Sequence, residues 1–157
     1  MVDDNYLAGI YPSVSRPSHR PIRNISHHAA QAFVGWLSSL SGRRVFLPTE
    51  AQWEAAAHNT DSFTSTLPSY DAPSFNGTAP QDMLGGVWEM TGTSFIPLAR
   101  LKEYDTLHAL SDSWPDSGAV VLKGGSYVSS NEISLYTVGV SSREECAEYT
   151  GFRVAWE

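Results

Sequence analysis

The stretch Gly42–Ala57, GRRVFLPTEAQWEAAA, specifies the local structure on which the rest of the fold depends. Its first part, Arg44–Leu47, is rich in β-branched and aromatic residues, which predicts a short strand that Pro48 ends. Thr49 can cap a helix, and Gln52 follows at the spacing of a capping box. The glutamate and alanines after Gln52 favour helix. The stretch therefore predicts strand, turn and helix, in that order.

Elsewhere in the chain, apolar residues recur first at helical and then at strand-like spacing. A first helix is expected over residues 26–41, ended by Gly42, and a second over residues 49–58. Residues 60–80 and 92–118 are expected to be irregular. Short strands are expected at residues 44–47, 85–89, 120–122, 127–129, 133–140 and 152–156. Two helices followed by several short strands predict an α+β fold.

Composition and charge describe one globular domain over residues 1–157, in which residues 1–20 form an N-terminal strand and linker. Hydrophobic residues make up 41% of the chain, enough for a buried core. The edge strand is expected at Tyr6–Tyr11, before a proline-rich linker. The formal net charge of −7 repels phosphate backbones, so nucleic acid is excluded as a partner and a basic protein is favoured.

The chain has a single cysteine, Cys146, and so can form no internal disulfide. Acidic residues Asp3 and Asp4 interrupt the N-terminus, where a signal peptide would be apolar. No apolar run approaches the ~20 residues that span a bilayer. We therefore expect a cytoplasmic protein without a membrane partner.

Three ordered blocks of sequence carry a family resemblance. LPTEAQWEAAA, within residues 21–57, is similar to a LPTEAEWEYAA signature, and DMLGGVWEMTG at 82–92 is similar to DMxGNVWEWTxD. VLKGGSYVSS at 121–130 and GFRVA at 151–155 complete the pattern. The chain resembles the formylglycine-generating enzyme, or sulfatase-modifying factor, family. The resemblance implies a variant of the C-type lectin-like fold, here without the family's N-terminal sheet segment.

The motif residues have structural interpretations that need no ligand. Large aromatic side chains are most simply core residues, and paired glycines allow a tight turn or close backbone packing. An arginine between apolar residues is expected to bind a buried carboxylate, with Glu54 and Glu89 as candidates. The motif residues expected to be structural are Trp36, Trp53, Glu54, Trp88, Gly124, Gly125 and Arg153.

Catalysis is not expected, and no residue is assigned as catalytic. The resemblance implies a copper site made by two cysteines shortly after the Gly-Gly-Ser motif. The matching positions hold Ser129 and Ser134, and a hydroxyl is a poor ligand for Cu(I). Cys146 lies too far along the chain to restore a pair. The sequence therefore predicts no formylglycine-generating activity.

Metal sites have little support, and no cofactor is expected apart from a possible calcium ion. The resemblance places calcium near the second block, where Glu89 is retained but Gly86 replaces an asparagine ligand. His27 and His28 are adjacent at a helix start, so their side chains diverge. We expect a surface role for both.

Two functional classes remain open. The first is a non-catalytic binding module, neutralising, variable-recognition or regulatory, that recognises a protein or another ligand through the loops at 92–118 and 128–150. The second is a subunit or degenerate relative of a formylglycine-generating or non-haem iron oxidase, completed by another chain or a second copy. The residues expected to bind are Phe95, Tyr104, Trp114, Tyr136, Glu144, Glu145 and Tyr149.

Overall fold

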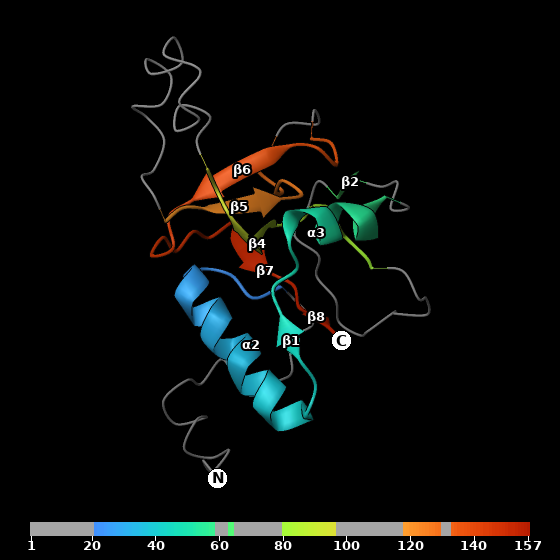
Figure 1. Cartoon of the computed structure of the whole chain (residues 1–157). Helices are drawn as coiled ribbons and strands as arrows, with labels where there is room; N and C mark the ends of the chain where they lie inside the picture. The colour runs from blue at the N-terminus through green and yellow to red at the C-terminus, as the bar shows by residue number, and fades with distance from the viewer. Residues whose placement is uncertain (1–20, 59–62, 65–79, 97–117, 130–132) are drawn as a thin grey trace, which may run out of the picture.

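A computed structural model describes residues 21–58, 63–64, 80–96, 118–129 and 133–157. Figure 1 shows the elements in chain order: α2 (His27–Ser41), β1 (Val45–Phe46), α3 (Glu50–Ala57), β2 (Phe63–Thr64), β3 (Leu84–Gly85), β4 (Trp88–Ser94), β5 (Val120–Lys123), β6 (Val138–Ser141), β7 (Thr150–Phe152) and β8 (Ala155–Trp156). The fold is α+β, as predicted. None of the described helices combines the length and the apolar character needed to cross a bilayer.

The central feature is a four-stranded sheet in the order β6-β5-β4-β7. Strand β5 pairs antiparallel with both β4 and β6, whereas β7 runs parallel to β4. Two smaller pairs flank this sheet, β1 with β8 (antiparallel) and β2 with β3 (parallel). Tyr6–Tyr11, the expected edge strand, lies outside the described residues.

Both helices begin where the sequence predicts. The hydroxyl of Ser26 accepts a hydrogen bond from the Ala29 amide, and Gly42 ends α2 in a left-handed conformation with φ of 67°. Helix α3 begins with the complete capping box, in which Thr49 and Gln52 bond each other's backbone amides. The two predicted helices are therefore confirmed, to within a residue at each end.

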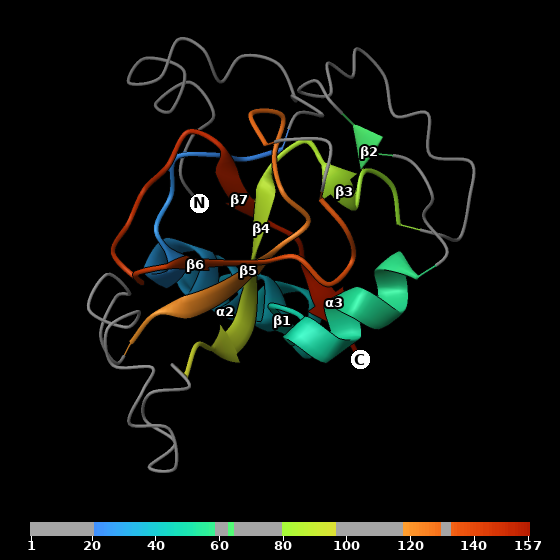
Figure 2. The same ribbon diagram turned by 90° about the horizontal axis from the view of Figure 1, so that it is seen from above.

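The central sheet separates the two helices because its strands alternate between faces. Met90, Val120 and Leu122 pack with Ala30 and Val34 of α2 in the larger core cluster. Residues of the opposite face bond to α3. Figures 1 and 2 show α2 and β1 on one side of the sheet and α3 beside β4 and β5. Each face of the sheet thus holds one helix.

The prediction that Trp36 is a core residue was wrong, since its side chain is 57% exposed. The core face of α2 is formed instead by Ala30, Val34 and the partly buried Leu37. Trp53 is buried as expected, and Trp88 is half-buried against the larger core cluster. Successive helical residues point about 100° apart, so Leu37 takes the inward position and turns Trp36 to the flank.

Several strand predictions were also corrected. Residues 127–129 form a turn, in which the Ser129 amide donates to the Ser126 carbonyl oxygen. The strand expected over 133–140 begins only at Val138, because a turn bonded between Ser134 and Thr137 precedes it. The strand expected over 85–89 is divided between β3 and β4, and β4 runs on to Ser94 into the region expected to be irregular. Short hydroxyl-rich turns compete locally with the strand ladder.

Candidate functional site

A buried lysine ties α3 to the sheet. Lys123, at the end of β5, is fully buried, and its Nζ lies 2.6 Å from Glu54 Oε1 and 3.5 Å from Glu50 Oε1. The same ammonium lies 5.9 Å from the centre of the Trp53 ring. A buried ammonium needs such partners, because its desolvation is otherwise costly. Both carboxylates therefore stabilise the packing of α3 on the sheet, although the Glu54 side chain remains partly exposed to solvent.

The second internal contact joins all three sequence blocks. Glu89 is almost fully buried, and its Oε2 accepts hydrogen bonds from Trp53 Nε1 at 2.7 Å and Arg153 Nε at 2.6 Å. Its Oε1 accepts from Arg153 Nη2 at 2.6 Å, and that nitrogen also donates to the Gln81 carbonyl oxygen. The expected pairing of Arg153 with a carboxylate is present. A calcium ion at Glu89 would share its oxygens with these donors, and such an ion stays a prediction.

The Gly124–Gly125 pair permits the close packing at the end of β5. A Cβ on Gly124, whose φ is 91°, would lie 2.5 Å from the Met83 carbonyl oxygen. A Cβ on Gly125, whose φ is 71°, would lie 2.8 Å from the Ile133 side chain. Only glycine adopts such angles readily and leaves this space. We call the end of the sheet that carries this turn the glycine-turn end.

The strand registers place Ser129 and Ser134 near this same end, since they follow β5 and precede β6. The Ser129 hydroxyl accepts from the Ser126 amide at 3.0 Å, and the Ser134 hydroxyl lies 3.3 Å from that of Thr137. Both hydroxyls thus take part in local turns. The sole cysteine, Cys146, is exposed in the loop between β6 and β7.

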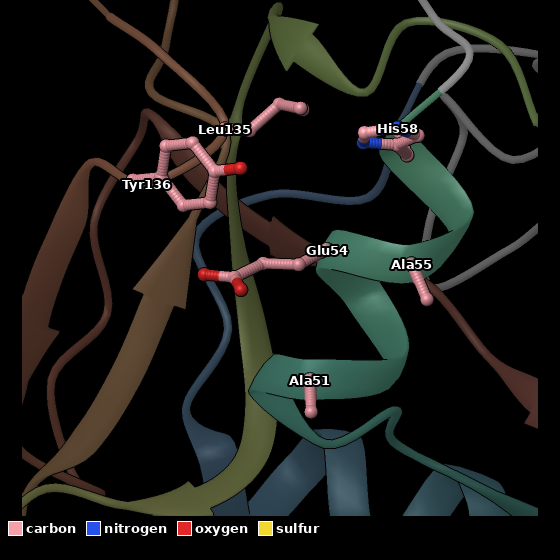
Figure 3. A pocket seen from close by; sticks show the side chains of 6 residues that line it. All are labelled: Ala51, Glu54, Ala55, His58, Leu135 and Tyr136. Atoms are coloured by element: carbon pink, nitrogen blue, oxygen red, sulfur yellow. The ribbon is translucent and has the colours of Figure 1, made fainter.

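A shallow hollow of about 230 Å³ opens beside the glycine-turn end. Figure 3 shows Leu135 and Tyr136 reaching from the loop before β6 toward Glu54 and His58 of the α3 segment. Ala51 and Ala55 line the side of the hollow that α3 forms, and their small side chains make this side shallow. Ligand pockets usually measure about 300–1,000 Å³, so this hollow is smaller than most of them.

The structure divides the residues that the sequence predicted to bind. Tyr136 and Tyr149, 72% and 40% exposed, precede β6 and β7 at the glycine-turn end. Glu144, Glu145 and the half-buried Phe95 lie toward the other end of the sheet. The register pairs Lys123 with Val138 at one end and Val120 with Ser141 at the other. Tyr104 and Trp114 lie outside the described residues.

The surface position expected for His27 and His28 is found for His28 only. His28 is exposed and its Nε2 lies 3.3 Å from Glu144 Oε1, a contact that lowers the pKa of Glu144. His27, in contrast, is 1% exposed, so the expected surface role was wrong for it. Its Nε2 lies 3.1 Å from the Thr91 carbonyl oxygen and its Nδ1 lies 3.1 Å from Nη1 of Arg143. The arginine donor and the carbonyl acceptor fix the neutral ring with its proton on Nε2.

Sequence reasoning missed Lys123, His58 and the contact between His27 and Arg143. A lysine that ends the apolar run VVLK was a visible signal for a buried charge. The partners of Lys123 are far away in sequence, so nothing local identified them. Within the described part of the chain, no group of three or more His, Cys, Asp or Glu residues could hold a metal ion.

Comparison with protein families assigns this architecture. The sequence matches the sulfatase-modifying factor enzyme 1-like domain over residues 5–70 and 58–157. The chain belongs to this family. The sequence blocks that indicated the family are the ones that Glu89, Trp53 and Arg153 join in the structure. No curated protein matches the chain.

Solved structures share the family fold. PvdO from Pseudomonas aeruginosa is 18% identical with a TM-score of 0.63, and the match covers 91% of this chain and 64% of PvdO. CarF is 17% identical (TM-score 0.62; 92% of this chain and 70% of CarF). Variable protein 1 of Treponema denticola is 21% identical (TM-score 0.59; 90% and 73%). The chain thus spans less than two thirds of the length of PvdO. At these sequence identities, the similarity to the three structures establishes a shared fold and nothing about activity.

Proposed function

We propose that this chain is a non-catalytic protein-binding module whose contact surface is the glycine-turn end of the sheet. One observation carries the proposal: the positions where the resemblance places copper-binding cysteines hold Ser129 and Ser134, with their hydroxyls bonded in turns. The same end presents the exposed ring of Tyr136 beside a hollow. Exposed aromatic rings around a small depression are typical of interface hot spots.

A basic protein is the partner that the charges favour. The chain carries a net charge of −7, and the partly exposed Glu54 lines the hollow beside Tyr136. Glu144 and Glu145 are exposed at the other end of the sheet. Their distance from the hollow suits long-range attraction more than direct contact, and such attraction acts mainly on the association rate.

The test begins with a partner recovered by pull-down from the native host. Tyr136→Ala and Tyr149→Ala should each weaken binding by about 1–3 kcal/mol if the residue is a hot spot. Trp156→Ala is the matched control, because Trp156 is 62% exposed and belongs to β8, outside the glycine-turn end. Unchanged affinity for both tyrosine variants, with melting temperatures like that of the wild type, would place the binding surface elsewhere.

A second measurement separates binding from catalysis. The purified protein should not convert cysteine to formylglycine in a sulfatase-type peptide supplied with copper and oxygen, because it lacks a thiolate pair. Cys146→Ser should leave folding and binding unchanged, since Cys146 is exposed. Turnover, or stoichiometric copper or iron in the protein, would favour the alternative of an enzyme or enzyme subunit.

A further inference from the structure

The loop that follows β6, residues 142–146, is held against the start of α2. The His27 amide, one of the donors that a helix leaves unpaired in its first turn, donates to the Arg143 carbonyl oxygen at 3.1 Å. Nη1 of Arg143 lies 3.1 Å from His27 Nδ1, and Nη2 donates to the Ser94 hydroxyl at 2.9 Å. Arg143 thus joins the loop to both α2 and β4. We call these contacts of Arg143 the Arg143 latch.

The latch requires a neutral His27 ring. Nε2 of His27 carries the proton and lies 3.1 Å from the Thr91 carbonyl oxygen, so Nδ1 has a lone pair that accepts from Arg143. A second proton on the ring would make Nδ1 a donor that faces the Arg143 donor at hydrogen-bond distance. The ring would also gain a positive charge beside the guanidinium. Protonation of His27 therefore replaces an attraction with a repulsion.

The surroundings of His27 disfavour this positive charge. Burial is the main effect that lowers the pKa of His27, and the charges of Arg143 and His28 lower it further, against the hydrogen bond to Thr91. His27 is also the first residue of α2, where the helix dipole is positive, and the first turn contains no acidic residue. While the loop is attached, the ring therefore stays neutral near pH 7.

The two carboxylates of the loop make other contacts. Glu144 Oε1 lies 3.3 Å from His28 Nε2, and Glu145 Oε2 accepts from the Ser141 hydroxyl at 3.0 Å. Both glutamates are exposed, and neither is among the charges that act on His27. Protonation of His28 would strengthen its pair with Glu144 and oppose release of the loop. An exposed pair contributes little, however, so the repulsion at Arg143 dominates.

The chain after residue 146 has anchors that do not involve the His27 ring. The Asn24 and Thr150 amides both donate to the Ala147 carbonyl oxygen at 3.1 Å. Arg23 Nη1 donates to the Glu148 carbonyl oxygen at 3.2 Å. These bonds survive protonation of the ring. Loss of the latch would therefore free residues 142–146 without detaching β7.

We propose that the Arg143 latch is a pH-sensitive switch, in which protonation of His27 releases residues 142–146 from the start of α2. In the released state, the Arg143 guanidinium turns to solvent and water reaches the imidazolium. The loop stays attached above pH 6.5, the ordinary pKa of histidine. It is released as the pH falls below this value, because the hydrated ring binds a proton more readily than the buried one. The opening is local and independent of the partner surface at the glycine-turn end.

A spin label on the natural cysteine tests the proposal, because Cys146 is exposed and lies in the loop. The full chain is labelled with a nitroxide methanethiosulfonate, and EPR and far-UV circular dichroism spectra are recorded at pH 7.5 and pH 5.5. We expect the fraction of mobile nitroxide to rise several-fold at pH 5.5 in the wild type, with unchanged dichroism. His27→Gln should show no rise, because glutamine takes up no proton. His28→Gln, the matched control, should keep the rise.

Each other outcome overturns the switch. Equal mobility at the two pH values in the wild type would mean that the latch survives acid. A similar rise in His27→Gln, or none in His28→Gln, would assign the effect to another group. A rise that accompanies loss of dichroism would report general unfolding.

Arg143→Gln decides the question if His27→Gln fails to fold. This variant keeps His27 but lacks the cation that the protonated ring repels, so its label should be mobile at both pH values. An immobile label at pH 7.5, or a rise in mobility at pH 5.5, would show that Arg143 does not hold the loop.

Discussion

At the scale of single residues, Glu89 is the point at which the fold is most sensitive to a change of charge. Its side chain is 6% exposed and receives donors from the helix residue Trp53 and from Arg153. We predict that Glu89→Gln lowers the free energy of unfolding by about 2–4 kcal/mol, because it removes the carboxylate that is hydrogen-bonded to the partly buried Arg153 guanidinium. Urea denaturation of the two proteins measures the difference.

The chain offers a matched surface pair as the control. Arg44 and Glu157 form an ion pair with side chains 72% and 59% exposed, so Glu157→Gln should cost less than about 1 kcal/mol. Similar losses of unfolding free energy in the two variants would show that burial does not strengthen the ion pair between Glu89 and Arg153.

His27 gives the molecule a specific dependence on pH. Burial lowers the pKa of His27 below its ordinary value of 6.5, and the nearby charge of Arg143 lowers it further, against the opposing hydrogen bond to Thr91. The unfolded chain therefore takes up a proton at a higher pH than the folded chain. Stability is complete above pH 6.5 and falls as the pH drops below that value.

We predict that the urea midpoint decreases between pH 7 and pH 5 in the wild type and decreases less in His27→Gln. His28→Gln is the control, because His28 is exposed and its ion pair with the exposed Glu144 contributes little to stability. The idea fails if the two variants show the same pH profile. A glutamine keeps a polar side chain at position 27 but cannot take up the proton.

At the scale of elements, the turn after β5 sets the geometry of the glycine-turn end. We predict that Gly124→Ala destabilises the protein more than Gly42→Ala. Both glycines have positive φ, which costs an L-residue about 1–2 kcal/mol. A Cβ at position 42 meets nothing within 4 Å, whereas one at position 124 meets a backbone oxygen and Trp53. Thermal melts of the two variants measure the extra steric cost, and equal melting temperatures would contradict it.

The elements also show how far the sequence could specify the structure. Helices α2 and α3 were predicted to within a residue, because Ser26, Thr49 and Gly42 are local signals whose partners lie within four residues. The strand expected at 127–129 was wrong, since the backbone angles of the preceding glycines and a serine hydrogen bond form a turn there. Propensity alone does not report such competition.

The candidate site was predictable only where a family motif carried it. The pairing of Arg153 with a carboxylate was expected because this arginine lies between apolar residues of the GFRVA motif, and the structure selects Glu89 over Glu54. The partners of Lys123 and His27 could not be inferred. Each pair joins residues more than 60 positions apart, and nothing in the local sequence marks such contacts.

At the scale of the whole molecule, one sheet serves two helices. Alternate residues of β4 and β5 face α2 and α3, so Met90 and Leu122 belong to one side while Glu89 and Lys123 belong to the other. If either helix separated from the sheet, it would expose β4 and β5, against which the other helix packs. The described domain should therefore unfold as one cooperative unit.

We predict that one substitution on each face lowers the same transition. Val34→Ala removes buried methyl groups on the α2 side, at a cost of about 1–2 kcal/mol. Trp53→Phe removes a buried ring and a hydrogen bond to Glu89 on the α3 side, and should cost at least as much. In both variants, the urea curves from tryptophan fluorescence and from far-UV circular dichroism should coincide. Fluorescence reports mainly side-chain packing, whereas dichroism reports the helices, so separate midpoints would mean that α2 and α3 belong to independently unfolding halves. If either substitution shifts one common midpoint, α2 and α3 unfold together. We expect this result because the side chains of β4 and β5 alternate between the two faces, so both helices pack on the same strands.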